Sequence, residues 1–261
     1  MGVVNVTPDS FSDGGLNLEP AAATATARRL LDEGAALVDV GGESTRPGAG
    51  AVTVDEELRR VVPVLVGLSG LPVSIDTTKA EVARQALALG ASMVNDVTAL
   101  RGDPELGAVI ADAGAYVCLM HMQGEPRTMQ LEPRYDDVVG EVAAFLEERL
   151  AVAVAAGIRE EHVCLDPGIG FGKTPDQNLA LIRGLERICL IGPPVLVGLS
   201  RKSTLARVVG DPSARVGSTA ASVGAAIAAF DRGAALFRAH DAAPHVEALA
   251  AAAAIERGGV A

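Results

Sequence analysis

The chain has no tryptophan and few other aromatic residues, which make up 3% of its 261 residues. It is also poor in basic residues, because 22 lysines and arginines stand against 33 aspartates and glutamates, which gives a formal net charge of −11. Proteins that bind nucleic acids need a basic face that releases counterions, and many stack aromatic rings on bases. The composition therefore argues against a nucleic-acid partner, but it allows a small anion in one basic pocket.

Long uninterrupted apolar segments are missing as well. The longest apolar stretches are rich in alanine and are interrupted by charged residues or glycine, so we expect no membrane span, no secretion signal and a cytoplasmic protein. Cysteine is scarce, and Cys118, Cys164 and Cys189 are odd in number and lack the spacing of a metal site. We expect them to be buried thiols in a reducing compartment.

What the sequence does contain is a series of eight short apolar runs that end on polar residues. Such runs are typical of strands buried on both faces, and here they alternate with helical segments roughly every thirty residues. This pattern predicts a single (β/α)8 TIM barrel over residues 1–261, with its active site at the carboxyl ends of the strands. The polar ends are residues 5–7, Asp39, Asp76, Asn95, His121, Asp166, Ser200 and residues 238–241.

Glycine, proline and aspartate mark the expected helix boundaries. Pro20 and Pro175 are placed for the first turns of two helices, and Asp137 precedes a third. The alanine-rich residues 242–254 carry enough apolar anchors to form a last outer helix. Glycines that would end helices in the left-handed conformation are Gly34, Gly90, Gly114, Gly157 and Gly233.

The segments after the first two runs differ from ordinary connections. Residues 5–15 read NVTPDSFSDGG and residues 41–52 read GGESTRPGAGAV, and both are rich in Gly, Pro, Ser or Asp. Ordering such loops costs conformational entropy, so they fit segments that close over a substrate. Phe11 and Arg46 would then bring an apolar and a cationic side chain to the mouth of the barrel. Either loop taken alone would equally fit a surface loop without function.

One motif is misleading. Residues 168–174, GIGFGKT, resemble a phosphate-binding loop, but Pro167 stands where that loop needs glycine, and Pro175 falls where its helix should already be running. We therefore expect no nucleotide site here, and we expect Lys173 to be a solvated loop cation. For His121, at the end of the fifth run, packing and contact with a ligand are both open.

Eight motifs in order resemble the dihydropteroate synthase family of the folate pathway. They extend from Gly2 to about His245 and read NVTPDSFSDGG, DVGGESTRPGA, SIDTTK, NDV, LMHMQGEPRTMQ, LDPGIGFGKT, GLSRKS and FRAHD. The resemblance implies a transferase that condenses 6-hydroxymethyl-7,8-dihydropterin diphosphate with p-aminobenzoate, giving 7,8-dihydropteroate and pyrophosphate. It also implies Mg²⁺, a homodimer and competition by sulfonamides.

For the pterin, the resemblance implies a site at the strand ends. Asp166 resembles the family's clamp on the aminopyrimidinone edge, where a carboxylate can accept two charge-assisted hydrogen bonds. Asn95 can both donate and accept at the adjoining edge, and Asp76 suits the ring N–H nearer the reacting methylene. Lys202 would serve the ring carbonyl, and Arg238 is also implied at the pterin.

The same resemblance assigns residues to the diphosphate of the pterin substrate and to the second substrate, p-aminobenzoate. It places the diphosphate at Asn5, Thr45, Arg238 and His240, with Asn5 as the Mg²⁺ ligand. Arg238 and His240 are two residues apart, so in an extended strand both can reach one anion. The residues implied at p-aminobenzoate are Phe11, Thr45, Arg46, Pro47, Ser200 and Lys202. Those expected to carry the catalysis are Asp76, Lys202, Arg238 and His240.

Two alternatives stay open. A pterin-dependent methyltransferase of similar barrel type would not need the STRPG, SRK and RAHD motifs together. A catalytically silent pterin-binding homologue usually lacks motif residues, and none is lost here. One departure is visible, because related chains usually carry an N-terminal segment, commonly a hairpin, before the first strand. This chain begins directly on that strand, so we expect either a less covered barrel bottom or an incomplete start.

Overall fold

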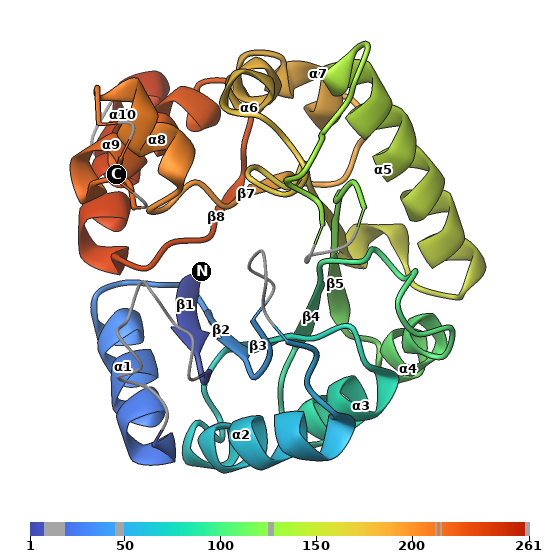
Figure 1. Ribbon diagram of the computed structural model, residues 1–261. Coiled ribbons are helices and arrows are strands. Elements are labelled where there is room, and N and C mark those ends of the chain that lie inside the picture. The colour runs from blue at the N-terminus through green and yellow to red at the C-terminus, as the bar shows by residue number, and fades with distance from the viewer. Residues whose placement is uncertain (8–18, 45–49, 125–127, 212, 215, 259–261) are drawn as a thin grey trace.

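The computed structural model describes residues 1–7, 19–44, 50–124, 128–211, 213–214 and 216–258. Within these ranges, eight parallel strands alternate with helices, which form a ring outside the strands (Figure 1). Each strand falls within one of the eight apolar runs, so that prediction is confirmed. The strands are β1 (Gly2–Asn5), β2 (Val38–Gly41), β3 (Val73–Asp76), β4 (Met93–Asp96), β5 (Tyr116–Met120), β6 (Val163–Asp166), β7 (Leu196–Val197) and β8 (Leu236–Phe237).

The strands close into a barrel. Strands β1 to β6 form one parallel sheet in chain order, and β7 pairs with β8. Two isolated parallel bridges, Leu165–Val195 and Gly2–Ala239, connect these two groups. Beside the Gly2–Ala239 bridge, the Val3 N–H donates to the Ala239 carbonyl at 3.0 Å. The predicted (β/α)8 barrel is therefore confirmed, and the carboxyl ends of its strands share one face.

The helices in the described residues connect the strands on the outside of the barrel. The predicted last helix is present as α10, and the short 3₁₀ turn η1 precedes β6. Their bounds are α1 (Pro20–Asp32), α2 (Val54–Gly67), α3 (Ala80–Ala88), α4 (Leu106–Ala113), α5 (Val138–Ala155), η1 (Glu160–His162), α6 (Pro175–Arg183), α7 (Leu185–Cys189), α8 (Ser203–Val208), α9 (Thr219–Phe230) and α10 (Ala242–Arg257).

Local signals set where these helices begin and end. Pro20 and Pro175 take the first positions of α1 and α6, and Thr174 closes a capping box at the start of α6. At the start of α5, Asp137 Oδ1 accepts from the Gly140 N–H at 3.1 Å. The glycines predicted to end helices all have positive φ angles, at Gly34, Gly90, Gly114, Gly157 and Gly233.

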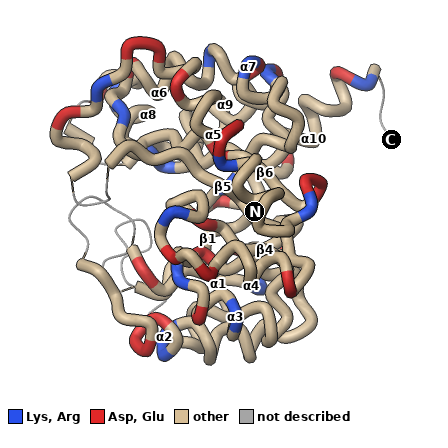
Figure 2. The backbone as a smooth tube through the Cα atoms, turned by 90° about the vertical axis from the view of Figure 1, so that its right-hand side faces the viewer, with Lys and Arg blue, Asp and Glu red and all other residues tan. Residues whose placement is uncertain are grey.

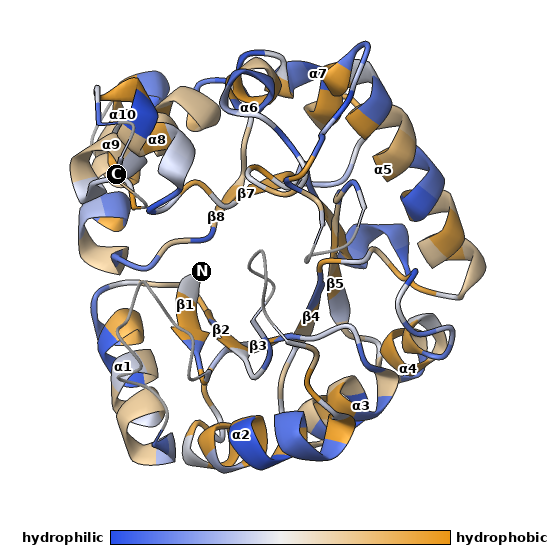
Figure 3. Ribbon diagram, viewed as in Figure 1, coloured by the Kyte–Doolittle hydropathy of each residue, from blue (hydrophilic) through white to orange (hydrophobic). Residues whose placement is uncertain are grey.

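Apolar side chains of the strands pack under the helices and form the main core. Figure 3 shows the strands as largely apolar, with the hydrophilic residues concentrated on helices and loops. A smaller cluster joins strands β4 to β7 through Met93, Cys118, Cys164 and Leu196. Cys118 and Cys164 are buried free thiols, as predicted, whereas Cys189 is only partly buried.

Charged residues of both signs are interspersed over the outside of the molecule (Figure 2). Among the described helices, none combines the length and apolar character needed to cross a membrane.

The left-handed end of α4 predicts a stability change. Gly114 has φ 61° and ψ 25°, and a Cβ built there would meet nothing within 4 Å. Gly114→Ala should therefore lower the free energy of unfolding by about 1 kcal/mol through backbone conformation alone. Gly114→Asn should cost less, because asparagine tolerates this conformation better. Urea unfolding measures both, and equal losses in the two variants would contradict this explanation.

Candidate active site

A partly buried arginine, with 22% of its side chain exposed, joins the segment after β8 to strands β2 and β3. Arg238 follows β8, and its Nε donates to Asp39 Oδ2 at 2.7 Å while its Nη2 donates to Asp76 Oδ2 at 2.9 Å. Asn95 Nδ2 donates to the same Asp39 oxygen at 3.0 Å. The structure thus brings together Asp76, Asn95 and Arg238, which the sequence placed around the pterin.

Asp39 is a residue whose role the sequence analysis missed. It is 0% exposed, and its Oδ1 atom is buried without a hydrogen-bond partner among the described residues. The signal was present, because an aspartate inside the apolar run ALVDVGG is costly to bury without a partner. That partner is Arg238, which lies 199 residues away in the sequence.

The pKa values of Asp76 and Arg238 are both shifted in this cluster. Burial, together with the charge of Asp39, raises the pKa of Asp76 to about 7, although Arg238 opposes the shift. Burial alone would lower the pKa of Arg238, but the charges of Asp39 and Asp76 outweigh it and raise that pKa further. Arg238 therefore stays charged, and Asp76 is the group that can titrate.

Asp166, at the end of β6, is a further buried carboxyl group at the mouth of the barrel. It is 6% exposed, and its Oδ1 accepts from the Gly168 N–H at 2.7 Å. Burial raises the pKa of Asp166 to about 6, against the lowering effects of that hydrogen bond and of Lys202, Lys173 and Arg238. The group is mostly ionised at neutral pH and can accept hydrogen bonds from a ligand.

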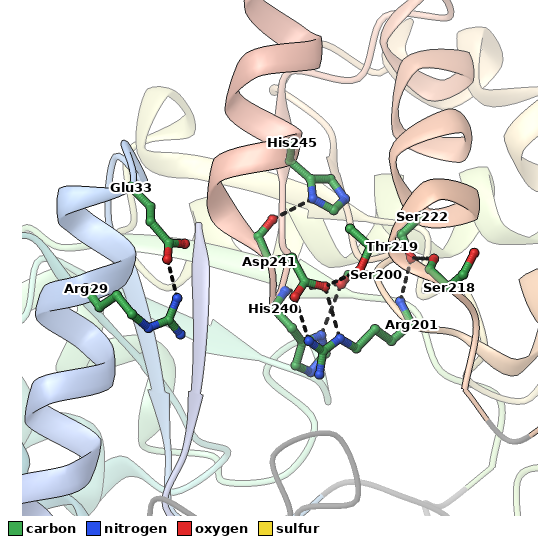
Figure 4. A network of polar contacts seen from close by, with 10 residues as sticks. All are labelled: Arg29, Glu33, Ser200, Arg201, Ser218, Thr219, Ser222, His240, Asp241 and His245. Carbon is green, nitrogen blue, oxygen red and sulfur yellow. Dashed lines mark hydrogen bonds and ion pairs between the residues drawn. The ribbon is translucent and has the colours of Figure 1, made fainter.

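The loops after β7 and β8 are tied together by polar contacts (Figure 4). Ser200 Oγ accepts from the His240 backbone N–H at 3.1 Å and lies 3.2 Å from His240 Nδ1. Arg201 has a positive φ of 59°, and its guanidinium donates twice to Asp241, with Nε–Oδ2 at 3.0 Å and Nη2–Oδ1 at 2.6 Å. Two neighbouring residues of this turn, Ser200 and Lys202, are thereby fixed in place.

Strand β8 ends at Phe237, so Arg238 and His240 follow the strand instead of lying within it. The two-residue period of an extended strand therefore does not set their directions. Arg238 contacts the carboxylates after β2 and β3, whereas His240 contacts Ser200 after β7. Arg238 would therefore meet an anion beside His240 while it stays paired with Asp39 and Asp76.

The expectation for Lys173 is wrong. Its side chain is buried at 2% exposure, and Nζ lies 2.9 Å from His121 Nδ1, 3.0 Å from the Gly168 carbonyl and 2.9 Å from the Phe171 carbonyl. Burial lowers the pKa of Lys173 to about 7, with Lys202 acting in the same direction and Asp166 against it. The lysine enters the protein because polar acceptors from two loops surround it.

His121 has a packing role in this arrangement. Its ring lies edge-on to Phe145 with centroids 4.8 Å apart, and burial, followed by the charges of Lys173 and Arg101, lowers its pKa to about 3. The imidazole is therefore neutral near pH 7 and accepts from Lys173.

A second buried ion pair lies below the loop that follows β2. Lys79 pairs with both Glu43 and Glu57, and Glu57 is 0% exposed. Glu43 Oε1 also accepts from the Val52 N–H at 3.0 Å. This network links the described residues on either side of positions 45–49. Sequence reasoning gave these acids no role, although a glutamate on the buried face of a predicted helix was the available signal.

The remaining predicted site residues divide into two groups. Asn5 ends β1 on the same face of the barrel as the acids, and it is partly buried. Four residues assigned to p-aminobenzoate or diphosphate lie outside the described residues: Phe11, Thr45, Arg46 and Pro47.

Comparison with known proteins identifies the family of this chain. A model of the pterin binding enzyme family matches residues 1–240. Dihydropteroate synthase from Neisseria meningitidis serogroup C is 48% identical over 258 residues, covering 96% of this chain and 90% of that protein. The Escherichia coli K12 enzyme is 44% identical over 253 residues, covering 95% and 88%. This chain belongs to the dihydropteroate synthase family.

Solved dihydropteroate synthases share the fold over nearly the whole chain. The Yersinia pestis enzyme in a sulfonamide complex has a TM-score of 0.92 and 42% identity, covering 98% of this chain and 94% of that one. The Xanthomonas albilineans enzyme with 4-aminobenzoic acid has a TM-score of 0.88 and 50% identity, covering 98% and 92%. A structure of the X. albilineans enzyme with 7,8-dihydropteroate has a TM-score of 0.85, with the same coverage and 48% identity.

The raised pKa of Asp76 predicts how the stability of the ligand-free dihydropteroate synthase depends on pH. The unfolded state releases this proton near pH 3.8 and the folded state near 7, so the folded state binds more protons between these values. The contribution of Asp76 to stability therefore falls as pH rises through that window. Asp76→Asn should be more stable than wild type at pH 8, and the difference should shrink toward pH 4.

Thermal melts from pH 4 to pH 8 measure this difference. The exposed Asp112→Asn, which removes one carboxylate from α4, is the matched control and should show no such pH-dependent gap. A gap for Asp76→Asn that is constant with pH would show that its titration does not set the effect.

Proposed function

We propose that this chain condenses 6-hydroxymethyl-7,8-dihydropterin diphosphate with p-aminobenzoate, giving 7,8-dihydropteroate and pyrophosphate. The observation that carries the proposal is the convergence of Asp76, Asn95, Asp166 and Arg238 at one mouth of the barrel, in a member of this family. The solved relatives with 4-aminobenzoic acid and with 7,8-dihydropteroate support this choice of substrate and product.

The pterin is assigned to the acids and amide of this cluster. The ionised carboxylate of Asp166 would accept from two N–H groups of the aminopyrimidinone edge, and charge-assisted hydrogen bonds of this kind are worth about 1.5–3 kcal/mol each. Asn95 and Asp76 would meet the ring along the adjoining edge. The Lys202 ammonium, which lies 4.3 Å from the centre of the Phe171 ring, would donate to the ring carbonyl.

The diphosphate is assigned to the end of the barrel where the last two strands meet. His240 and Ser200 lie there, and Arg238 supplies a permanent positive charge. Phosphate groups commonly bind near the last strands of such barrels. Asn5 and Thr45 complete the assignment on the side of the first two loops.

We also propose Mg²⁺ as the cofactor. Among the described residues, no group of three or more His, Cys, Asp or Glu side chains could hold a metal ion. Asn5 offers one carbonyl oxygen, which is a hard ligand of the type that Mg²⁺ accepts, and Mg²⁺ commonly takes substrate phosphates and water for the rest. These residues fit an ion held mainly by the diphosphate, where it would neutralise charge on the leaving group.

In the proposed reaction, the C–O bond between the pterin methylene and the diphosphate breaks, and the electron pair leaves with pyrophosphate. The amino group of p-aminobenzoate forms the new C–N bond and then loses one proton. Neutral aniline is already a nucleophile, so no dedicated base is needed. Asp76 would stabilise the electron-poor pterin, while Arg238 and His240 take up charge on the departing pyrophosphate.

We assign p-aminobenzoate to Ser200 and Lys202, together with Phe11, Thr45, Arg46 and Pro47, which lie outside the described residues. Ser200 and Lys202 lie just before the start of α8, and N–H donors at a helix start suit a carboxylate. Sulfonamides resemble this substrate in shape and should compete for the same place. The sulfonamide complex of the Y. pestis relative supports this expectation.

We further propose that the protein acts in the cytoplasm as a homodimer, as its family likeness suggests. Sedimentation equilibrium of the purified chain would give twice the chain mass if the dimer is right and the chain mass if it is wrong.

Asp76 provides a kinetic test of the mechanism. Asp76→Asn keeps the shape of the side chain and one acceptor but removes the charge that would stabilise the transition state. We expect kcat to fall by about 100-fold or more, while the dissociation constant of the dihydropterin diphosphate rises by no more than about tenfold. Steady-state kinetics and direct titration measure the two quantities. Equal losses in both would make Asp76 a binding group only.

Release of pyrophosphate tests the proposed function itself. Purified protein with dihydropterin diphosphate and Mg²⁺ should release pyrophosphate only when p-aminobenzoate is added, and a sulfonamide should raise the apparent Michaelis constant for p-aminobenzoate. Lys202→Ala should lower the rate by about 100-fold, because it removes a donor to the pterin and a cation from the second pocket. Tight pterin binding without any release would instead identify a catalytically silent homologue.

A further inference from the structure

The buried Lys173 lies in the connection between β6 and α6, outside the set of residues assigned to substrate. Its Nζ contacts acceptors from two loops: His121 Nδ1 and the His121 carbonyl after β5, and the carbonyls of Gly168 and Phe171 after β6. The distances to these four atoms are 2.9, 3.4, 3.0 and 2.9 Å, respectively. One ammonium group therefore holds both loops.

The two loops also approach each other closely through their backbones. A Cβ on Gly168 would lie 1.9 Å from the His121 carbonyl oxygen, and one on Gly172 would lie 2.6 Å from the Gln123 carbonyl oxygen. Both glycines have positive φ angles, of 66° and 64°. Side chains at these two glycines would clash with the loop after β5, and Lys173 Nζ donates to carbonyl oxygens of both loops at this contact.

The loop that Lys173 holds carries the neighbours of two proposed pterin contacts. The Gly168 N–H donates to Asp166 Oδ1 at 2.7 Å. The Phe171 ring lies 4.3 Å from the Lys202 ammonium, which places a cation over an aromatic face. A displacement of residues 168–171 would therefore move the partners of both Asp166 and Lys202.

Lys173 also acts on Asp166 through its charge. The charged groups that face Asp166 are Lys202, Lys173 and Arg238, and each favours the ionised carboxylate. The buried thiol of Cys118 is the other titratable neighbour. The largest charge effects on Asp76 come from other residues: Asp39, Arg238, Glu57 and Asp96.

We infer that Lys173 is a positioning residue for pterin binding, which holds residues 168–171 against the end of β5 and keeps the Asp166 carboxylate ionised and aimed at the ligand. This inference rests on the proposed function, because it takes the pterin to be the ligand of Asp166. Lys173 itself does not touch the substrate in this assignment.

Direct binding of 6-hydroxymethylpterin to the full chain tests the inference. This probe carries the aminopyrimidinone edge but has no leaving group, so binding is measured apart from turnover. Wild type should bind it above pH 6 and lose affinity as Asp166 takes up a proton. Lys173→Met should raise the dissociation constant at pH 8 by about tenfold and move the midpoint of the acid loss to higher pH.

Two comparisons separate this role from a general structural one. Arg183→Met removes one positive charge from the exposed face of the adjacent helix α6, and it should leave both the affinity and the midpoint unchanged. In an Asp166→Asn background, the acid loss assigned to Asp166 should be absent, and adding Lys173→Met should not restore it. A lower melting temperature with unchanged affinity and midpoint would overturn the inference. Absence of binding by wild type would instead count against the proposed function.

A second measurement does not require the Lys173 variant to fold. The chain contains three lysines, Lys79, Lys173 and Lys202, so a lysine-labelled sample gives a simple NMR spectrum, and Lys202→Ala assists its assignment. The Lys173 signal should titrate near pH 7 in wild type. Asp166→Asn should move that titration to lower pH, because the attraction of the carboxylate for the ammonium is lost. A titration that does not move would overturn the coupling.

Discussion

The ion pairs of Arg238 with Asp39 and Asp76 are the interaction on which the candidate site depends. They bind the residue after the last strand to the ends of β2 and β3, so the same contacts that fix the site also fasten the barrel across its closing seam. Two buried carboxylates on one guanidinium leave an excess of negative charge. Burial of that excess raises the pKa of Asp76. The N–H donors of a ligand would compensate the excess negative charge.

Cations linking neighbouring loops recur around the mouth of the barrel. Lys79 joins the loops after β2 and β3, Lys173 joins those after β5 and β6, and Arg201 joins those after β7 and β8. The strands in the described residues are only two to five residues long, so the sheet alone holds the loops weakly. Each cation contacts an acceptor outside its own loop, and each therefore fixes the distance between adjacent parts of the site.

The sequence was sufficient for features that depend on local order. The barrel followed from apolar runs with polar ends, and the end of α4 followed from Gly114, because glycine adopts the left-handed conformation needed there more readily than other residues. Burial of Lys173 could not be predicted in the same way. A lysine after a glycine-rich segment is typical of an exposed loop, and its burial also needs acceptors from the loop after β5, some 50 positions earlier. Asp39 was missed for a similar reason, since Arg238 is distant in the chain.

Stability and binding act against each other at the same carboxyl groups. The pKa values of Asp76 and Asp166 are raised chiefly by burial, so ionising them weakens the folded, ligand-free protein. A pterin that donates to these groups would favour their charged forms and offset that cost. The free energy of such contacts is then available only to a ligand with donors in the right places. The buried acids would thus contribute to specificity as well as affinity, because a ligand without the matching N–H groups would leave their charges uncompensated.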